Sequence, residues 1–313
     1  MKALVTGCAG FIGSHLTERL LKEGYEVVGV DCFTAYYSKN IKDNNLYTAL
    51  NHDNFEFINK DLLSIDKYPD VDYVFHQAAQ AGVRASWGKY FDTYLEYNIR
   101  LTQKLLEYYK DRNIKKFVYA SSSSVYGNTD ELPMNEKSLL NPVSPYGVTK
   151  LAAEHLCSLY CTNYSMPTIS LRYFTVFGPR QRPDMAIFKF VSKILNDEEI
   201  TVYGNGSQTR DFTYVDDIVE ANFLAATSDV VGEVVNIGGG NNITVNDLIK
   251  QIELTVGKQA KIKYIDTQKG DVKNTKSNVT KARKLLNWKA ETNIVEGLDK
   301  FIEWFRENKY LYK

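Results

Sequence analysis

Three side chains have the types and spacing needed to take a proton from an alcohol. Tyr146 and Lys150 are four residues apart in a segment with helical patterning, so they share one face of the predicted helix. A lysine ammonium beside a phenol lowers the phenol's pKa from about 10, because the positive charge favours the phenolate. Ser122 is expected at the end of a strand, where its hydroxyl can share a hydrogen bond with the substrate hydroxyl. Together the three predict a general base for an alcohol that loses hydride from the same carbon.

A glycine-rich turn stands near the start of the chain. Residues 6–13 read Thr-Gly-Cys-Ala-Gly-Phe-Ile-Gly and join the first expected strand to the first expected helix. Gly7, Gly10 and Gly13 permit a tight turn, close approach of backbone to a pyrophosphate, and close packing of helix on sheet. Asp31 ends the second expected strand, where a carboxylate accepts hydrogen bonds from the adenosine ribose and repels a 2′-phosphate. These features predict a dinucleotide site that favours NAD over NADP.

The elements that must position these residues alternate between strand and helix. Strands are predicted at Lys2–Thr6, Glu26–Val30, Phe55–Ile58, Asp72–His76, Phe117–Ser121, Thr168–Tyr173 and Glu233–Ile237. Helices are predicted at Phe11–Lys22, Tyr94–Lys110, Tyr146–Asn163, Met185–Leu195, Val245–Val256, Thr280–Leu286 and Ile294–Asn308. Strands separated by helices imply right-handed crossovers and a parallel sheet covered on both faces. The expected fold is therefore α/β, a doubly wound parallel sheet of the Rossmann type with a smaller α/β substrate-binding lobe.

The expected lobes divide the chain unevenly. Residues 1–172 with about 212–240 are predicted to form the NAD-binding Rossmann domain, and about 173–211 with 241–313 the substrate-binding lobe. That lobe should cover the carboxyl ends of the strands, where ligands of doubly wound folds bind. The polar stretch 34–54 is a candidate mobile flap near the adenosine.

Composition limits the partners of the chain. Its 313 residues include 38 basic and 38 acidic side chains, and a formal net charge of zero argues against a nucleic-acid or anionic-membrane partner. There is no signal-peptide pattern and no apolar run of membrane-spanning length. Cys157 and Cys161 could share a helical face and a metal, but small buried side chains in a reduced cytosol explain the four cysteines better. We expect a cytoplasmic protein without a metal.

The chain resembles the extended short-chain dehydrogenase/reductase family. The glycine turn, Asp31, the set of Ser122, Tyr146 and Lys150, and residues 172–179 (Arg-Tyr-Phe-Thr-Val-Phe-Gly-Pro) carry the resemblance, in order and over essentially the whole length. Within this family the chain is similar to nucleotide-sugar epimerases, and among them to UDP-glucuronate 4-epimerases. The resemblance implies tightly held NAD, a UDP-sugar substrate, and a homodimer paired through the helices predicted at Tyr94–Lys110 and Tyr146–Asn163.

The resemblance also assigns roles to individual residues. Counting back from Tyr126, Ser122 matches the catalytic serine or threonine and joins Tyr146 and Lys150. Asp61, which closes the third predicted strand, could contact the adenine, whereas His76 is expected to be structural. The expected cofactor contacts are Gly7, Gly10, Phe11, Ile12, Gly13, Asp31, Asp61, Leu62, Gln77, Ala78, Ala79, Tyr146, Lys150 and Tyr173.

The two residues after Ser122 separate the reactions of this family. Similar 4,6-dehydratases have an Asp-Glu pair there, and decarboxylating relatives have Glu at the second position, whereas this chain has Ser123 and Ser124. Elimination and decarboxylation therefore lack their expected acid and base. A hexuronate oxidised at C4 is a β-keto acid that readily loses carbon dioxide. Hydroxyls of Ser123, Ser124 and Thr175 can hold its carboxylate in a less productive orientation. Alternatively, the serines line a loop or serve a neutral hexose.

UDP must be anchored firmly while the sugar turns. Arg210 is the leading diphosphate ligand, because a guanidinium fork suits phosphate oxygens. The other expected substrate contacts are Arg84, Ser86, Ser123, Ser124, Thr175, Arg182, Gln208 and Asp271, with Phe188 and Tyr203 beside the uracil; a surface arginine and core aromatics are the plain alternatives. Two positions depart from the family pattern: Gln268 stands where relatives often have an arginine, and Asn278 where an acid is common.

The sequence thus predicts NAD-dependent 4-epimerisation of a UDP-sugar, with UDP-glucuronate converted to UDP-galacturonate through a transient 4-keto sugar and Tyr146 as the base. The alternatives are a UDP-glucose or UDP-N-acetylglucosamine 4-epimerase, a UDP-glucuronate decarboxylase, a dehydrogenase that releases NADH, and a non-catalytic NAD sensor.

Overall fold

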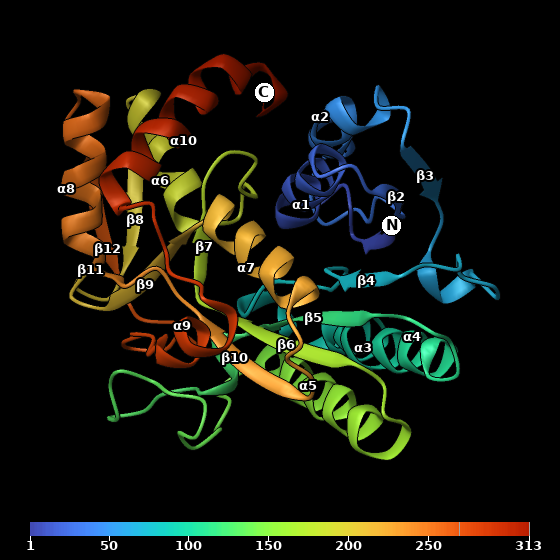
Figure 1. Ribbon diagram of the computed structural model, residues 1–313. Helices are drawn as coiled ribbons and strands as arrows, with labels where there is room; N and C mark the ends of the chain where they lie inside the picture. Colours follow the sequence, from blue (N-terminus) through green and yellow to red (C-terminus); the bar gives the residue numbers. More distant parts are fainter. Residues whose placement is uncertain (269, 313) are drawn as a thin grey trace.

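A parallel sheet of seven strands forms the centre of the larger part of the protein (Figure 1). The computed structural model describes residues 1–268 and 270–312. The strand order is β10-β6-β5-β4-β1-β2-β3, and every neighbouring pair is parallel. The strands are β1 (Lys2–Thr6), β2 (Glu26–Asp31), β3 (Phe55–Asn59), β4 (Tyr73–His76), β5 (Lys116–Ser122), β6 (Thr168–Tyr173) and β10 (Glu233–Ile237). The predicted doubly wound α/β class is confirmed.

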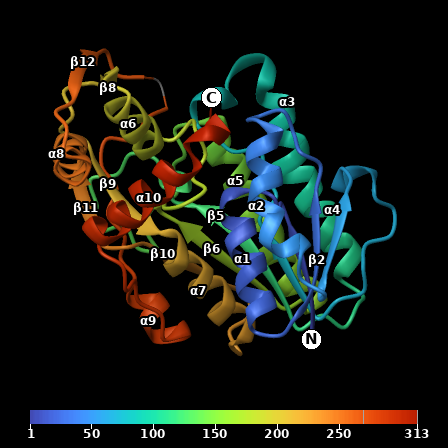
Figure 2. The same ribbon diagram turned by 90° about the horizontal axis from the view of Figure 1, so that it is seen from above.

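Helices cover both faces of this sheet (Figures 1 and 2). On one face lie α1 (Phe11–Lys22), α2 (Lys39–Leu50) and α7 (Val215–Thr227), and on the other lie α4 (Leu101–Tyr109) and α5 (Pro145–Tyr164). Because helices cover both faces, the central strands are apolar on both sides, whereas the edge strand β3 is partly exposed. In β1, for example, Ala3, Leu4 and Val5 are all fully buried.

A smaller lobe begins where the chain leaves the carboxyl end of β6. It contains β7 (Thr175–Phe177), β8 (Glu199–Tyr203), β9 (Thr209–Tyr214), β11 (Asn241–Thr244) and β12 (Lys261–Ile265). These strands form two small sheets, in the orders β11-β9-β7 and β12-β8. The helices α6 (Ala186–Leu195), α8 (Val245–Val256) and α10 (Ile294–Asn308) pack beside them, while α9 (Thr280–Leu286) lies against β10. None of the described helices combines the length and the apolar character needed to cross a bilayer.

Two predicted segments differ from the structure. The single helix predicted at Tyr94–Lys110 is continuous in path but divided into α3 (Phe91–Tyr94), a π-helical segment η4 (Leu95–Arg100) and α4. The wider π turn places the buried side chain of Asn98 against the backbone of Gln80, with which it makes two hydrogen bonds. Helical periodicity in the sequence does not reveal such a bulge.

The stretch 34–54, expected as a flap, contains the packed helix α2. Ile41, Leu46 and Ala49 are buried in it, and so are the polar Lys42 and Asn45. Because polar residues occupy part of the buried face of α2, the spacing of apolar residues in the sequence did not indicate a helix. Lys42 Nζ donates to the Thr34 carbonyl (2.6 Å) and Asn45 Nδ2 to the Ala9 carbonyl (3.0 Å), so this helix is tied to the glycine turn.

Two neighbouring residues of α2 test whether it packs as a helix. Replacing the buried Leu46 by alanine should lower the free energy of unfolding by about 2–4 kcal/mol, because the change leaves a cavity. Tyr47, which is 71% exposed, is the matched control, and Tyr47→Ala should change stability by less than about 0.5 kcal/mol. Denaturant unfolding measures both values. Equal effects would contradict the packed helix.

Candidate active site

The glycine turn fits its surroundings so closely that side chains are excluded. Gly7 has φ +71°, and a Cβ added there would lie 2.9 Å from the backbone of Ala78 at the end of β4. A Cβ added to Gly13 would lie 2.1 Å from the Gly7 carbonyl oxygen. Gly10 caps α1 without any side-chain hydrogen bond, so the N–H groups of the first helical turn are left for a ligand.

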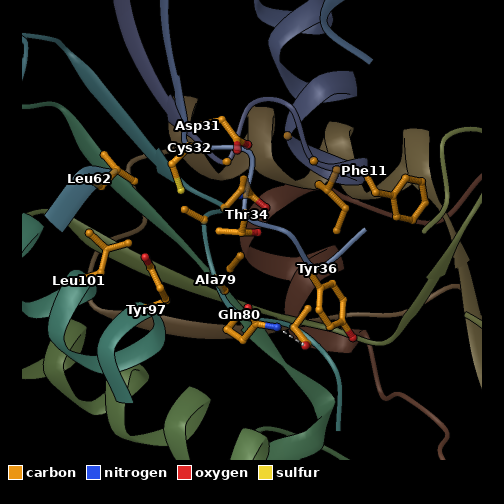
Figure 3. Close-up of a pocket in the computed structure, with 18 of the residues that line it drawn as sticks. Phe11, Asp31, Cys32, Thr34, Tyr36, Leu62, Ala79, Gln80, Tyr97 and Leu101 are labelled. Carbon is orange, nitrogen blue, oxygen red and sulfur yellow. Dashed lines mark hydrogen bonds between the residues drawn. The ribbon is translucent and has the colours of Figure 1, made fainter. Parts of the chain in front are cut away.

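Two carboxylates follow the turn along the sheet. Asp31, the last residue of β2, accepts hydrogen bonds from the backbone N–H groups of Ala9 (3.1 Å) and Phe33 (2.9 Å), which fix it beside the glycine turn. Asp61 accepts from the Leu63 N–H (2.8 Å) and the Tyr97 hydroxyl (2.6 Å). Figure 3 shows Asp31 and Tyr97 among the residues that line one cavity.

That cavity extends from the glycine turn to Tyr146. Every residue predicted above to contact the cofactor lines it, from Gly7 to Tyr173, together with Arg182. Sequence reasoning missed further lining residues, which are Val30, Cys32, Thr34, Tyr36, Tyr37, Lys42, Lys60, Gln80, Ala81, Tyr97, Leu101, Ala120 and Ser121. Several of these lie in the stretch 34–54, whose polar composition hides any single functional position.

The start of α5 holds two of the expected catalytic residues. Ser144 caps the helix by accepting a hydrogen bond from the Gly147 N–H (3.1 Å), and Pro145 occupies the first turn. Tyr146 and Lys150 therefore lie one turn apart, as predicted. A Cβ added to Gly147 would lie 2.5 Å from the Ser124 carbonyl oxygen, so the helix start touches the end of β5. There Ser122 lies close enough to Tyr146 to lower the pKa of the phenol.

The charge state of this pair differs from the expectation. Burial raises the pKa of Tyr146 above its ordinary value, while the Ser122 side chain and the positive charge of Arg182 lower it. Burial also lowers the pKa of Lys150 to about 7. Lys150 therefore does not produce the predicted depression of the phenol's pKa, because desolvation acts on both groups.

The loop after β4 is held by a chain of buried hydrogen bonds. The Thr102 hydroxyl donates to the Asn98 carbonyl (2.7 Å), so it accepts from His76 Nε2 (3.0 Å). His76 Nδ1 then accepts from the Thr6 hydroxyl (2.8 Å), which accepts in turn from the Ala78 N–H (3.1 Å). Burial lowers the pKa of His76 to about 3, so the ring is neutral. His76 thus positions the backbone beside the cavity without facing a ligand.

A second group of predicted residues gathers between the loop after β4 and the smaller lobe. Arg84 pairs with Asp271 through two contacts (3.3 and 2.6 Å), and its guanidinium lies 3.9 Å above the ring of Tyr203. Burial lowers the pKa of Arg210. The charge of Asp271 raises this pKa and the charge of Arg84 lowers it, so both residues lie near Arg210. Gln208 donates to the Tyr203 carbonyl (2.8 Å). The structure therefore brings five predicted substrate contacts together.

The remaining predicted contacts fall into separate places. Arg182 lines the cavity, pairs with Asp184 (2.9 Å) and lies over the ring of Tyr36, whose hydroxyl donates to Asp184 (3.1 Å). Ser86 is buried and donates to the Val83 carbonyl (2.6 Å), which closes the short turn containing Arg84.

Three hydroxyl residues follow the strands that reach the site. Ser123 and Ser124 begin a 3₁₀ turn directly after β5, and Thr175 begins β7, two residues after Tyr173.

Gln268 donates to the Asp266 carbonyl (3.3 Å), and the Asn278 side chain accepts from the Thr280 N–H (3.0 Å), so both departures from the family pattern make local bonds.

Phe188 is located elsewhere. It is 4% exposed, and its ring packs against Phe305 (5.2 Å) and Tyr312 (4.6 Å) inside the smaller lobe. A helical pattern in the sequence cannot tell which aromatic residues of α6 point into the core and which point into a cleft. The structure therefore corrects the expectation that this residue contacts a uracil.

A sequence profile of the NAD dependent epimerase/dehydratase family matches residues 3–238. The chain belongs to this family. It is 42% identical to an uncharacterised UDP-glucose epimerase, YtcB, of Bacillus subtilis strain 168, with 95% of this chain and 96% of that protein covered. It is 41% identical to a UDP-glucuronate 4-epimerase of Thermodesulfobacterium geofontis strain OPF15, with 99% and 98% covered.

Solved structures agree with this placement in the epimerase/dehydratase family. The crystal structure of UDP-glucuronic acid 4-epimerase from Bacillus cereus, in complex with UDP-glucuronic acid and NAD, has a TM-score of 0.95 and 42% identity to this chain. It covers 98% of this chain and 100% of the other. The resemblance to nucleotide-sugar epimerases is confirmed.

The depressed pKa of Lys150 has a consequence for stability. The lysine titrates at about 7 in the folded chain and at about 10.4 when unfolded. Between these values the unfolded chain binds more protons, so the free energy of unfolding rises with pH by up to about 1.4 kcal/mol per unit. In nucleotide-free protein, denaturant unfolding should show this rise, and Lys150→Met should abolish it. If the free energies of unfolding of the two proteins vary with pH in parallel, Lys150 has an ordinary pKa in the folded chain and the prediction is wrong.

Proposed function

We propose that this protein is an NAD-dependent UDP-sugar 4-epimerase that interconverts UDP-glucuronate and UDP-galacturonate. One observation carries the proposal: Tyr146, whose pKa is lowered by the neighbouring Ser122, lines the same cavity as the glycine turn and Asp31. A base for a sugar hydroxyl and a dinucleotide site therefore share one cavity. The similarity to UDP-glucuronate 4-epimerases over nearly the full length supports the same reaction.

The residues present fit NAD. The backbone turn at Gly7 and Gly13 has no room for side chains, the first turn of α1 is uncapped, and the Asp31 carboxylate is fixed at the end of β2. These are the features that hold a pyrophosphate and a ribose without a 2′-phosphate. We assign the cofactor contacts to the predicted residues that line the cavity. When bound, NAD supplies a hydride acceptor and donor at its nicotinamide.

Tyr146 moves the proton in this mechanism. Its phenolate oxygen accepts the proton of the 4-hydroxyl as C4 is oxidised, and the Ser122 hydroxyl holds the same oxygen. Burial opposes the phenolate, whereas Ser122 and the positive charge of Arg182 favour it. The bound 4-keto sugar then turns about its linkage to the diphosphate and presents its other face. As C4 is reduced, Tyr146 returns the proton, so the enzyme is unchanged after one turnover.

Anchoring of UDP is assigned to the arginines between the two lobes. Among residues 1–268 and 270–312, the hydrogen bonds of the Arg210 guanidinium come from Nη1 alone, to the carbonyls of Thr209 (2.8 Å) and Lys273 (3.1 Å), which leaves its other nitrogens for phosphate oxygens. Arg84, Tyr203 and Asp271 form the neighbouring wall, where a ring face and a carboxylate suit a uridine. Arg182 faces the cavity from the smaller lobe.

The uronate is favoured as the sugar because Ser123, Ser124 and Thr175 offer neutral hydroxyls for its carboxylate. No carboxylate side chain follows Ser122, where dehydratases and decarboxylases have one. A neutral UDP-hexose is the second candidate, which the similarity to a UDP-glucose epimerase favours. A non-catalytic NAD sensor is disfavoured because Tyr146, Lys150 and Ser122 are all kept.

Further parts of the proposal concern organisation. We infer that residues 1–172 with about 212–240 bind the cofactor, and that the rest binds the UDP-sugar. A homodimer paired through the helical stretch of η4 and α4 and through α5 is supported by exposed apolar side chains on η4 and α5, which are Leu95, Val148, Leu159 and Tyr164. A cytoplasmic location is supported by four free cysteines.

Proton NMR of the reaction tests the function. UDP-glucuronate incubated with the protein should yield UDP-galacturonate without added NAD being consumed, and Tyr146→Phe should bind NAD but lose at least about 1000-fold in kcat. Parallel samples contain UDP-glucose and UDP-N-acetylglucosamine. Turnover of the neutral sugars alone would remove the uronate assignment, and an active Tyr146→Phe variant would remove the base.

A glutamate at position 124 tests the role given to the hydroxyls. Ser124→Glu should increase the share of UDP-pentose and carbon dioxide, because it places an acid where decarboxylating relatives carry one. Ser124→Ala is the matched control and should release less carbon dioxide than the glutamate variant. Product ratios from NMR measure the effect. Equal ratios in both variants would contradict the assignment.

A further inference from the structure

Lys150 carries a buried positive charge without a carboxylate of its own. Its side chain is 3% exposed, and within residues 1–268 and 270–312 its Nζ makes no ion pair or hydrogen bond. A buried ammonium that lacks a partner is costly, so its surroundings decide how much of it stays charged.

The natural partner for Lys150 is engaged elsewhere. Glu154 lies one turn further along α5, at the i,i+4 spacing that ordinarily pairs a lysine with a glutamate. Both of its oxygens are instead taken by Arg172 of β6, at 3.0 and 2.6 Å, and one of them also accepts from the Ser121 hydroxyl at 2.7 Å. This pair is fully enclosed, because each side chain is 3% exposed.

The ring of Tyr119, rather than a carboxylate, lies beside the ammonium of Lys150. Lys150 Nζ lies 4.6 Å from the centroid of the Tyr119 ring, which is within the range of a cation–π interaction. Tyr119 comes from β5 and is 1% exposed, and its hydroxyl is buried without a partner in the described part of the chain. The ring face, rather than the hydroxyl, is therefore the part of Tyr119 that contacts the ammonium.

The other titratable groups around Lys150 are uncharged. His76 of β4 is neutral because burial lowers its pKa to about 3. On α5 itself, burial raises the pKa values of Tyr146 and Cys157. Tyr94 of α3, which meets the Tyr146 ring edge-on at 6.2 Å, also has a pKa raised by burial. Cys157 and Glu154 are the neighbours that raise the pKa of Lys150 against the effect of burial, and of these Glu154 is paired with Arg172.

We propose that Tyr119 and Arg172 are positioning residues that set the charge of Lys150. Arg172 keeps the Glu154 carboxylate away from the ammonium, and the Tyr119 ring stabilises the ammonium in its place. Lys150 is then left without a carboxylate partner, so that its ammonium is available to a ligand in the cavity. The inference rests on the proposed function, in which Lys150 belongs to the catalytic set.

Substitutions of Tyr119 and of Arg172 should shift the pKa of Lys150 in opposite directions. In the holoenzyme, loss of the Lys150 proton produces the alkaline limb of the pH profile of kcat. Tyr119→Leu removes the ring face and should shift this limb down by about 0.5–1 pH unit. Arg172→Met frees Glu154 to pair with Lys150 and should shift it up by about 1 unit. A general loss of packing would not shift the two limbs in opposite directions.

Conservative variants are the controls. Tyr119→Phe keeps the ring face and removes only the unpartnered hydroxyl, so its alkaline limb should coincide with that of the wild type. Arg172→Lys keeps a cation for Glu154 and should shift the limb by less than Arg172→Met does. The inference is overturned if the alkaline limb of the kcat profile lies at the same pH in Tyr119→Leu and Tyr119→Phe. It is also overturned if Tyr119→Leu and Arg172→Met shift this limb in the same direction.

A readout without turnover separates this inference from the proposed function. In nucleotide-free protein, the pH at which the Lys150-dependent rise in unfolding free energy begins should move down in Tyr119→Leu relative to Tyr119→Phe. This comparison also decides the inference if Arg172→Met does not fold. Wild-type protein that turns over no UDP-sugar would refute the proposed function, while the stability titration would still support or refute the roles of Tyr119 and Arg172.

Discussion

The buried ion pair between Glu154 and Arg172 is the interaction on which the reactive end of the sheet depends. It joins α5, which carries Tyr146 and Lys150, to β6, and the Ser121 hydroxyl extends it to the strand that ends at Ser122. Removing one member of such a pair commonly costs about 3–5 kcal/mol, because the other charge is left buried.

The same network continues across the sheet. Arg172 Nη1 donates to the Tyr126 hydroxyl (2.8 Å), which donates to Asn236 on β10 (2.7 Å). Three neighbouring strands, β5, β6 and β10, and the helix that covers them are therefore fixed relative to one another by satisfied polar groups. A base and its hydroxyl partner, held on two different elements, need this kind of support to keep a productive distance.

The cavity at the glycine turn and the neighbouring group of charged residues are built differently, and the difference suits the tasks proposed for them. At the glycine turn the backbone is closely packed, and Gly7 and Gly13 leave no space for side chains. The proposed UDP site contains long side chains in partly exposed ion pairs, such as Arg84 with Asp271. Such pairs contribute about 0–1 kcal/mol, so a diphosphate can replace them at little cost. A fixed cofactor and a rearranging sugar site agree with a substrate that must turn between two half-reactions.

Periodicity and glycine spacing were enough to predict most of the sheet and the helix starts. The bounds of β1, α1, β6 and α10 agree with the prediction, because each is an apolar segment between clear turn residues. Pattern analysis failed where polar side chains are buried. The helix α2 was not predicted because Lys42 and Asn45 are buried on its packed face, and the π turn at Asn98 has no recognisable sequence pattern. The side of α6 on which Phe188 points, and the pairing of Glu154 with Arg172 rather than Lys150, depend on tertiary contacts that spacing alone does not contain.

In the proposed reaction, the hydrogen that leaves C4 returns to the same carbon without exchanging with solvent. UDP-glucuronate carrying deuterium at C4 shows whether it does, with the product analysed by NMR and mass spectrometry and the absorbance of free NADH followed in parallel. We expect UDP-galacturonate that keeps its deuterium at C4, with no accumulation of free NADH. Loss of the deuterium to solvent, or its appearance in released NADH, would rule out this reaction.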